Sequence, residues 1–410
     1  MRIMVQKFGG TSVATKERML QVLEKVRTGL RSGCKVLVVL SARAGETNSL
    51  LTLANEWSDS PDPAECDVLI STGEQVSVAL FTMLIKDAGI KARSCTGGQI
   101  GVVSNDTFGK ARIKKIDTQT IEALFHDHDV LVVAGFQGVT EDGRITTLGR
   151  GGSDTSAVAL AAAAKAELCE IYTDVEGVFT TDPNLCAKAR KLELVSYDEM
   201  LEMASMGAKV LEIRSVEFAK KFKVPVLVRS TFSDAPGTLV TQEDQTMEHI
   251  MVSGIAYDKD QARITLRSVH DTPGVAASIF GPLAKARLSV DMIVQTPSRD
   301  GVTDMNFTVS RKDLKRALEI MEEVSKSVGG LEVLHDDNVA KISAIGVGMR
   351  SHSGVAAKAF AALKQENINI IMISTSEIKI SCIIEEKYTE LAVRTLHDAF
   401  ELDKGSYLEG

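Results

Sequence analysis

The sequence contains a glycine-rich segment, TTLGRGGSDTSA (146–157), directly before an alanine-rich run. Glycines ahead of a helix expose backbone N–H groups, which bind anions such as phosphate or carboxylate. The segment lacks the Lys-Ser/Thr pair that ends the common phosphate-binding loop. It therefore predicts a site for an anionic substrate at a helix N-terminus, with the lysine supplied from elsewhere. The residues that would form this site are Arg150, Gly151, Gly152, Ser153 and Asp154.

A lysine suited to phosphate chemistry stands in KFGGTS (7–12), at the end of an apolar run. The two glycines let the backbone approach a phosphate closely. The alternative is a strand-end lysine that only extends into solvent, and this hexapeptide alone does not decide between them. SARAGETN (41–48) also follows a strand-like run and offers the hydroxyls of Ser41 and Thr47. By itself it is more typical of an ordinary turn.

Glu74, in STGEQVSVALF (71–81), follows a glycine at the start of a helical pattern. A lone glutamate there is most often a helix N-terminal charge that the helix dipole favours. Beside Arg150 it gains a function, because the carboxylate would bind an ammonium while the guanidinium binds a carboxylate in a bidentate fashion. Together the two groups would hold a zwitterionic amino acid.

A third polar cluster follows another strand-like run, in YTDVEGVFTTDPN (172–184) and GAKVL (207–211). It offers side chains that could surround a bound ligand. The alternative is a hairpin with an acidic turn. The residues are Thr173, Asp174, Asp182 and Lys209.

Length, charge and cysteine content narrow the class of protein. A chain of 410 residues is long enough for two or three domains, and its net charge of −8 argues against a nucleic-acid partner. The six cysteines are scattered without C-x-x-C motifs, as expected of reduced thiols in the cytosol. We find no signal-peptide pattern and no uninterrupted apolar stretch of about 18 residues. We therefore expect a cytoplasmic protein that does not associate with membranes.

Short apolar runs alternate with helical patterns in the first half, which predicts a mostly parallel sheet covered by helices. The runs are 3–8, 36–42, 130–136, 170–175 and 224–230. In open α/β sheets, ligands bind beyond the carboxyl ends of the strands. Lys7, Ser41 and Asp174 stand at or near such ends, so they should converge on one site.

The second half contains an internal repeat. Residues 271–293 align without gaps on 351–373, with eight of 23 positions identical. Each copy reads as a βαββαβ unit of the ferredoxin-like type, without catalytic-looking residues, which favours a sensing role. We expect a catalytic domain at 1–248 and two repeat domains at 249–330 and 331–410, with terminal strands that can exchange between the two.

Taken in order, the segments KFGGTS, SARAGETN, STGEQ, AGFQGV, TTLGRGGSDTSA, YTDVEGVFTTDP and GAKVL resemble the aspartate kinases of the amino-acid kinase family. The repeat resembles their paired ACT domains, and the resemblance runs from Lys7 to about Glu401. It implies an α/β amino-acid kinase fold, a mostly parallel sheet sandwiched by helices, followed by two ferredoxin-like βαββαβ ACT domains. It also implies that ATP phosphorylates the side-chain carboxylate of L-aspartate to 4-phospho-L-aspartate, the first step toward lysine, threonine and methionine.

The same resemblance implies roles for individual residues. Lys7, Asp154 and Lys209 would act in catalysis. Aspartate would be held by Ser41, Thr47, Glu74, Arg150, Gly151, Gly152 and Ser153. The nucleotide would contact Lys7, Phe8, Gly9, Gly10, Thr173, Asp174, Phe179, Asp182, Asn184 and Lys209. Phe179 stands where a Tyr is common and Asn184 where an Arg is usual, so these two departures bear on the details of ATP binding.

The expected chemistry needs no general base, because the attacking carboxylate is ionised at neutral pH. Catalysis then consists of positioning and charge neutralisation. No cage of carboxylates stands out for a metal, so Mg²⁺ would bind mainly through the nucleotide phosphates and water.

The ACT resemblance implies lysine and/or threonine as effectors and a homo-oligomer formed through the ACT domains. The effector residues would be Asp271, Gly274, Asp291, Met292, Gln295, Ser353, Asn369 and Ile370. Two alternatives stay open: a related kinase that acts on another acceptor, and a non-catalytic amino-acid sensor.

Overall fold

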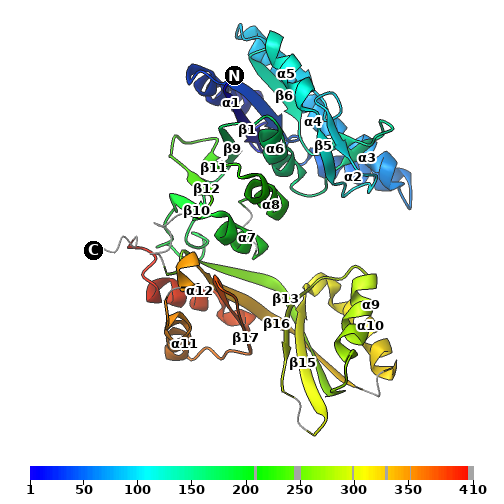
Figure 1. Cartoon of the computed structure of the whole chain (residues 1–410), viewed down its shortest axis with the longest axis vertical. Coiled ribbons are helices and arrows are strands. Elements are labelled where there is room, and N and C mark those ends of the chain that lie inside the picture. Colours follow the sequence, from blue (N-terminus) through cyan, green and yellow to red (C-terminus); the bar gives the residue numbers. More distant parts are fainter. Residues whose placement is uncertain (207–209, 244–250, 298–299, 328–330, 351, 405–410) are drawn as a thin grey trace. The chain divides into compact units, whose positions relative to one another are not determined.

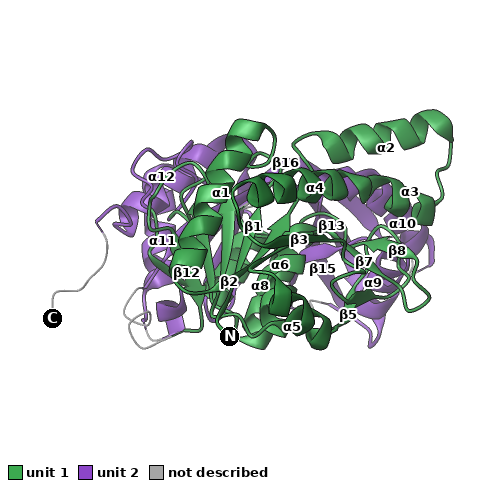
Figure 2. Ribbon diagram, turned by 90° about the horizontal axis from the view of Figure 1, so that it is seen from above, with its two compact units in different colours: residues 1–179, 191–244 green, residues 180–190, 245–410 purple. Residues whose placement is uncertain are grey.

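The computed structural model describes all residues except 207–209, 244–250, 298–299, 328–330, 351 and 405–410. The described chain divides into two compact units (Figure 2). Unit 1 comprises residues 1–179 and 191–244, and unit 2 comprises 180–190 and 245–410. Residues 180–190 fall inside the range expected for the catalytic domain, yet they pack within unit 2.

Unit 1 is built on an eight-stranded sheet with the strand order β10-β12-β11-β9-β1-β2-β6-β3 (Figure 1). Only the β11–β12 pair is antiparallel, so the prediction of a mostly parallel sheet is confirmed. Each of the five apolar runs forms a strand. The bounds are β1 (Ile3–Phe8), β2 (Lys35–Leu40), β3 (Ala92–Cys95), β6 (Val130–Ala134), β9 (Leu168–Thr173), β10 (Leu194–Ser196), β11 (Val226–Ser230) and β12 (Thr238–Thr241).

Helices cover both faces of this sheet. On one face, Val22 of α1 and Phe81 of α4 share a buried cluster with Val38 and Leu40 of β2. On the other face, α6 contacts β1, β2 and β9. The helices are α1 (Lys16–Arg31), α2 (Glu46–Trp57), α3 (Pro63–Ile70), α4 (Thr72–Asp87), α5 (Thr118–Asp127), α6 (Gly152–Ala163), α7 (Tyr197–Ser205) and α8 (Ile213–Phe222).

A second, four-stranded sheet in unit 1 has the order β5-β4-β7-β8 and was not predicted from the sequence. Its last strand leads directly into the glycine-rich segment before α6. The strands are β4 (Val102–Ser104), β5 (Ile113–Ile116), β7 (Gln137–Val139) and β8 (Ile145–Thr147).

The α3–α4 segment, Pro63–Asp87, is long and apolar enough to cross a membrane by length and composition alone. Glu65, Asp67 and Glu74 interrupt it, which is why the sequence showed no uninterrupted apolar stretch there. Half of its most apolar window is buried within the protein, as in the core helix of a globular domain.

Unit 2 contains a six-stranded sheet with the order β14-β15-β13-β16-β18-β17. The long strands β13 and β16 pair with each other along most of their length and lie at its centre. Figure 1 shows α9 and α10 at one end of this sheet and α11 and α12 at the other. The strands are β13 (Gly254–His270), β14 (Val290–Gln295), β15 (Val302–Val309), β16 (Glu332–Ile345), β17 (Met372–Thr375) and β18 (Lys379–Glu385). The helices are α9 (Val275–Lys285), α10 (Leu314–Ser327), α11 (Val355–Gln365) and α12 (Thr389–Ala399).

The two repeat copies form matching local structures. Gly274 precedes α9 and Gly354 precedes α11, with φ values of +95° and +96°. This left-handed conformation favours glycine, which explains why both copies carry it. Within the described residues the second copy ends with α12. The first part of β13, residues 254–258, pairs with the last part of β16, residues 341–345, and so supplies a strand beside the second copy.

Candidate active site

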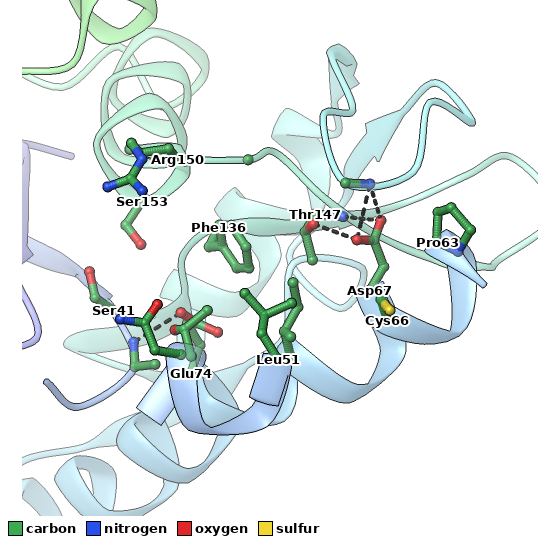
Figure 3. A pocket seen from close by; sticks show the side chains of 18 of the residues that line it. Ser41, Leu51, Pro63, Cys66, Asp67, Glu74, Phe136, Thr147, Arg150 and Ser153 are labelled. Carbon is green, nitrogen blue, oxygen red and sulfur yellow. Dashed lines mark hydrogen bonds between the residues drawn. The ribbon is translucent and has the colours of Figure 1, made fainter. Parts of the chain in front are cut away.

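A cavity of about 660 Å³ in unit 1 lies where the carboxyl ends of β1, β2 and β6 meet the N-terminal ends of α2, α4 and α6. This volume is typical of small-molecule sites. Figure 3 shows Arg150 and Ser153 on one side of the cavity and Ser41 and Glu74 on the other. All the residues expected to hold aspartate line it, together with two of the expected catalytic residues. They are Lys7, Ser41, Thr47, Glu74, Arg150, Gly151, Gly152, Ser153 and Asp154.

The glycine-rich segment forms the tight turn that starts α6. Gly151 is the N-cap with φ +69°, and a Cβ there would lie 2.0 Å from Cγ of Glu212. Only glycine fits such a position. Ser153 is buried in the first turn, whereas Arg150 is exposed and forms no ion pair within the described residues. The turn therefore presents N–H groups and a free guanidinium to an anion.

Lys7, near the end of β1, forms an ion pair with Asp154 in the first turn of α6. The distance between Nζ and Oδ1 is 2.6 Å, and both side chains are largely buried. The pair holds the ammonium at the cavity wall, where it can neutralise charge on an anionic substrate. The lysine missing from the glycine-rich segment is thus supplied by the first strand.

Glu74, in the first turn of α4, is buried with 3% of its surface exposed. Its Oε1 accepts a hydrogen bond from the Ala42 N–H at 3.0 Å, and its buried Oε2 has no hydrogen-bond partner among the described groups. Burial raises the pKa of Glu74 to about 7, and the bond from Ala42 opposes the shift only in part. A buried carboxylate oxygen without a partner is the feature expected where a cationic group of a ligand binds.

The backbone close to Lys7 explains the second glycine of KFGGTS. A Cβ on Gly10 would lie 2.7 Å from the carbonyl oxygen of Ala42, so a larger residue would separate the ends of β1 and β2. Gly9 lies beside Lys7 Nζ and has ordinary space around it. Phe8 is fully buried and stacks on Tyr172 at 4.6 Å, so only its backbone is available to a nucleotide.

Of the described residues expected to bind nucleotide, Lys7 lines this cavity and the others do not. Thr173 ends β9, and its hydroxyl accepts a hydrogen bond from the Val175 N–H; Asp174 beside it is exposed. Phe179 forms an isolated bridge with Lys191. Lys209 lies outside the described residues.

Asp182 and Asn184 lie in the segment 180–190 of unit 2. The Tyr257 hydroxyl donates to Asp182 Oδ2 at 2.9 Å, and the backbone and side-chain amides of Asn184 donate to Oδ1. The Asp182 carboxylate is therefore occupied by protein donors, which the sequence did not indicate.

The residues expected to bind effectors lie in matching parts of unit 2. Asp271, Gln295, Ser353 and Asn369 are exposed, and Ile370 is half-buried. Gly274 starts α9 as described above.

Two of the expected effector residues have partners on other strands. Asp291 of β14 forms an ion pair with Lys341 of β16, and Met292 packs in a buried cluster with Met372 of β17. The pairing of Asp291 was not predicted, because its partner lies 50 residues away in the chain.

Several cavity residues were missed from the sequence. Asn48 and Asn55 of α2 line the cavity, as do Asp67 of α3 and Thr147 of β8. Phe136 also lines it and adopts φ +69°, which is unusual for a side chain of its size. Its place in AGF, directly after a strand, was the available signal.

Comparisons with known proteins agree on one family. Residues 2–230 match the amino acid kinase family, and residues 264–328 and 342–400 each match an ACT domain. The aspartate kinase Ask_LysC of Stutzerimonas stutzeri is 55% identical over 404 residues, which cover 98% of each chain. The chain belongs to the aspartate kinase family.

Other aspartate kinases cover the same length. The aspartokinase of Helicobacter pylori is 50% identical over 406 residues, covering 98% of this chain and 100% of the relative. The crystal structure of E. coli aspartokinase III in complex with aspartate and ADP has a TM-score of 0.79 at 29% identity, covering 97% and 99% of the two chains. The sequence-based identification, the fold and the assignment as an aspartate kinase with tandem ACT domains are thereby confirmed.

Proposed function

We propose that this aspartate kinase binds L-aspartate in the cavity at the start of α6 and transfers the γ-phosphoryl group of ATP to its side-chain carboxylate. One observation carries the proposal: the cavity combines the Lys7–Asp154 pair with a free guanidinium and an unpartnered buried carboxylate oxygen. E. coli aspartokinase III, a structural relative, has been solved with aspartate and ADP.

Each end of the amino acid has a complementary group in the cavity. Arg150, Ser153 and the N–H groups at the start of α6 would bind the α-carboxylate, and Glu74 would bind the ammonium. Ser41, Thr47, Gly151 and Gly152 would complete the contacts. The side-chain carboxylate would then lie toward Lys7, where the phosphoryl group arrives.

In the transfer, an oxygen of the side-chain carboxylate forms a bond to the γ-phosphorus while the bond between that phosphorus and the β–γ bridging oxygen breaks. The products are 4-phospho-L-aspartate and ADP, and no proton has to be removed. Lys7, kept in place by Asp154, would neutralise charge on the transferring group, aided by Lys209. Mg²⁺ carried on the nucleotide phosphates would neutralise further charge.

ATP would extend along the ends of β1 and β9. We propose contacts from Lys7, Phe8, Gly9, Gly10, Thr173, Asp174, Phe179, Asp182, Asn184 and Lys209. The buried position of Phe8 restricts its contact to the backbone. Asp182 would have to exchange or share its bond from Tyr257.

The product would feed the synthesis of lysine, threonine and methionine in the cytoplasm. Lysine and/or threonine would bind the ACT domains and inhibit, and the ACT domains would join chains into a homo-oligomer. We propose a catalytic domain within 1–248 and ACT domains at 249–330 and 331–410, with segment 180–190 of the first range packed in unit 2. The crystal structure of E. coli aspartokinase III in complex with lysine and aspartate matches this chain with a TM-score of 0.75. The lysine bound in that relative supports an amino-acid effector.

The test is ADP release in the presence of Mg²⁺ and L-aspartate, with the acyl phosphate trapped by hydroxylamine. Glutamate, N-acetylglutamate, carbamate and uridylate serve as control acceptors. We expect ADP and hydroxamate to form in equal amounts with aspartate alone. ADP release without hydroxamate, or faster turnover of another acceptor, would contradict the proposal.

A further inference from the structure

Asp67, in the middle of α3, is a fully buried carboxylate in the wall of the cavity. Its Oδ1 accepts hydrogen bonds from the Thr147 hydroxyl at 2.6 Å and the Gly109 N–H at 3.0 Å. Its Oδ2 accepts from the Thr147 N–H at 2.8 Å and again from the Gly109 N–H at 2.9 Å (Figure 3). Burying a carboxylate is unfavourable unless hydrogen bonds replace those lost from water, and these four bonds provide that compensation.

The donors occupy both oxygens of Asp67, so the carboxylate does not face the substrate as a free ligand. It joins α3 to two segments that lie 42 and 80 residues further along the chain. Thr147 is the last residue of β8 and precedes Arg150 by three positions. The loop of Gly109 touches the same segment, since a Cβ on Gly149 would lie 3.0 Å from the Gly109 carbonyl oxygen.

Arg214 of α8 donates hydrogen bonds to backbone carbonyl oxygens of the same segment and of the Gly109 loop. One guanidinium nitrogen donates to the Leu148 carbonyl oxygen at 2.6 Å, and the other donates to that of Ala111 at 3.0 Å. Ala111 in turn donates its N–H to the Thr147 carbonyl oxygen at 2.8 Å. Asp67 therefore holds the N–H and hydroxyl of Thr147, and Arg214 holds the carbonyl oxygen of the next residue, Leu148.

We propose that Asp67 and Arg214 are positioning residues for the aspartate-binding turn, residues 149–154. They hold the residues directly before the turn from two elements, and so determine where Arg150 and Ser153 stand. Neither residue needs to touch the substrate. The inference rests on the proposed function, in which this turn binds aspartate and not ATP.

The geometry predicts a selective effect. Displacing a binding group by about 1 Å can lower rates by about 10²-fold. Such a displacement would affect the aspartate carboxylate, which Arg150 binds, much more than ATP. A purely structural role would instead lower the melting temperature and leave both Michaelis constants of the folded enzyme unchanged.

The experiment compares Asp67→Asn with Glu65→Gln, an exposed carboxylate on the same helix that does not line the cavity. Asn keeps the size but replaces one acceptor oxygen with an NH₂ group facing the same N–H donors. We expect Asp67→Asn to raise the KM for aspartate by about tenfold or more with the KM for ATP within about twofold. Hydrogen exchange should speed up at residues 146–154 and stay unchanged in β2. Glu65→Gln should match the wild type in every measurement.

Arg214→Lys gives a second, independent variant that keeps the charge but loses the two-pronged contact. It should show the same selective rise in the KM for aspartate, and it decides the matter if Asp67→Asn does not fold. Unchanged KM for aspartate in the folded variants, or an equal rise for both substrates, would overturn the inference. A wild-type enzyme that does not phosphorylate aspartate would instead refute the proposed function.

Discussion

The protonation of Glu74 should control how well this enzyme uses aspartate. Burial raises the pKa of Glu74 to about 7, and only the ionised form would attract the substrate ammonium. The pH dependence of kcat/KM reports the groups of the free enzyme. Below pH 7, kcat/KM for aspartate should therefore fall about tenfold per pH unit, because the ionised fraction falls by that factor. Above pH 7 it should level off.

The same raised pKa has the opposite consequence for stability. In the unfolded chain the carboxyl ionises near its usual 4.5, whereas in the folded protein it ionises near 7. The protonated form is thus favoured by folding, so the contribution of Glu74 to stability is fully present below pH 4.5 and is lost as the pH rises through 7. The difference between the two values corresponds to about 3 kcal/mol. Glu74→Gln, which stays neutral, should recover up to that amount at about pH 8 and nothing near pH 4.5.

The assay measures kcat/KM for aspartate and for ATP from about pH 5.5 to about pH 9, together with melting temperatures. Glu74→Gln should give a low, pH-independent kcat/KM for aspartate and a higher melting temperature than the wild type at alkaline pH. Glu122→Gln, exposed on α5, is the matched control and should behave as the wild type. A flat wild-type profile between about pH 6 and 8 would refute the reasoning, as would an unchanged profile in Glu74→Gln.

The remaining predictions concern the other charged groups and the effectors. Lys7→Ala should still fold, with a lower melting temperature because Asp154 loses its partner. It should retain less than about a tenth of kcat, a loss above about 1.4 kcal/mol; higher activity would assign the role to another group. Arg150→Lys should raise the KM for aspartate and leave the KM for ATP little changed, because a point charge cannot replace the bidentate contact. An equal rise in both KM values would contradict this assignment. Calorimetry should show lysine or threonine binding to the wild type and more weakly to Gln295→Ala and Asn369→Ala. Unchanged binding in both variants would place the effector pocket elsewhere, and no binding to the wild type would remove the feedback proposal.

The cavity could be anticipated from the sequence because its main groups stand at the ends of strong apolar strand patterns. Lys7 and Ser41 follow such patterns, and a parallel sheet brings the carboxyl ends of its strands to one edge. Arg150 and Ser153 were recognised by the glycines around them, whose left-handed turn the structure shows. In these places the local sequence determines the local structure.

Other features depend on partners that are distant in the chain. Asp67 reads in PAECDVLI as an ordinary helical acid, and only Gly109 and Thr147 give it a role. The strands β4, β5, β7 and β8 have three or four residues each, too few for a readable alternation.

The segment 180–190 reads as catalytic domain because it continues the motif YTDVEGVFTTDP. Its packing in unit 2 depends on side chains more than 200 residues later, such as the bond between Thr180 Oγ1 and His397 Nε2 at 2.9 Å. The sequence around Thr180 contains no pattern that predicts a partner as distant as His397.

That segment has a practical consequence for building chimeric enzymes. The chain passes from one unit to the other after residues 179, 190 and 244, so the unit that contains the ACT domains consists of two separate pieces of sequence. Among the contacts that join the pieces, the Lys188 ammonium pairs with Asp398 at 2.8 Å, and the Tyr257 hydroxyl donates a hydrogen bond to Asp182. Exchanging only the later piece would remove one partner of each contact. A graft intended to give this kinase the feedback response of a relative should therefore transplant the donor's counterpart of residues 180–190 along with its ACT domains.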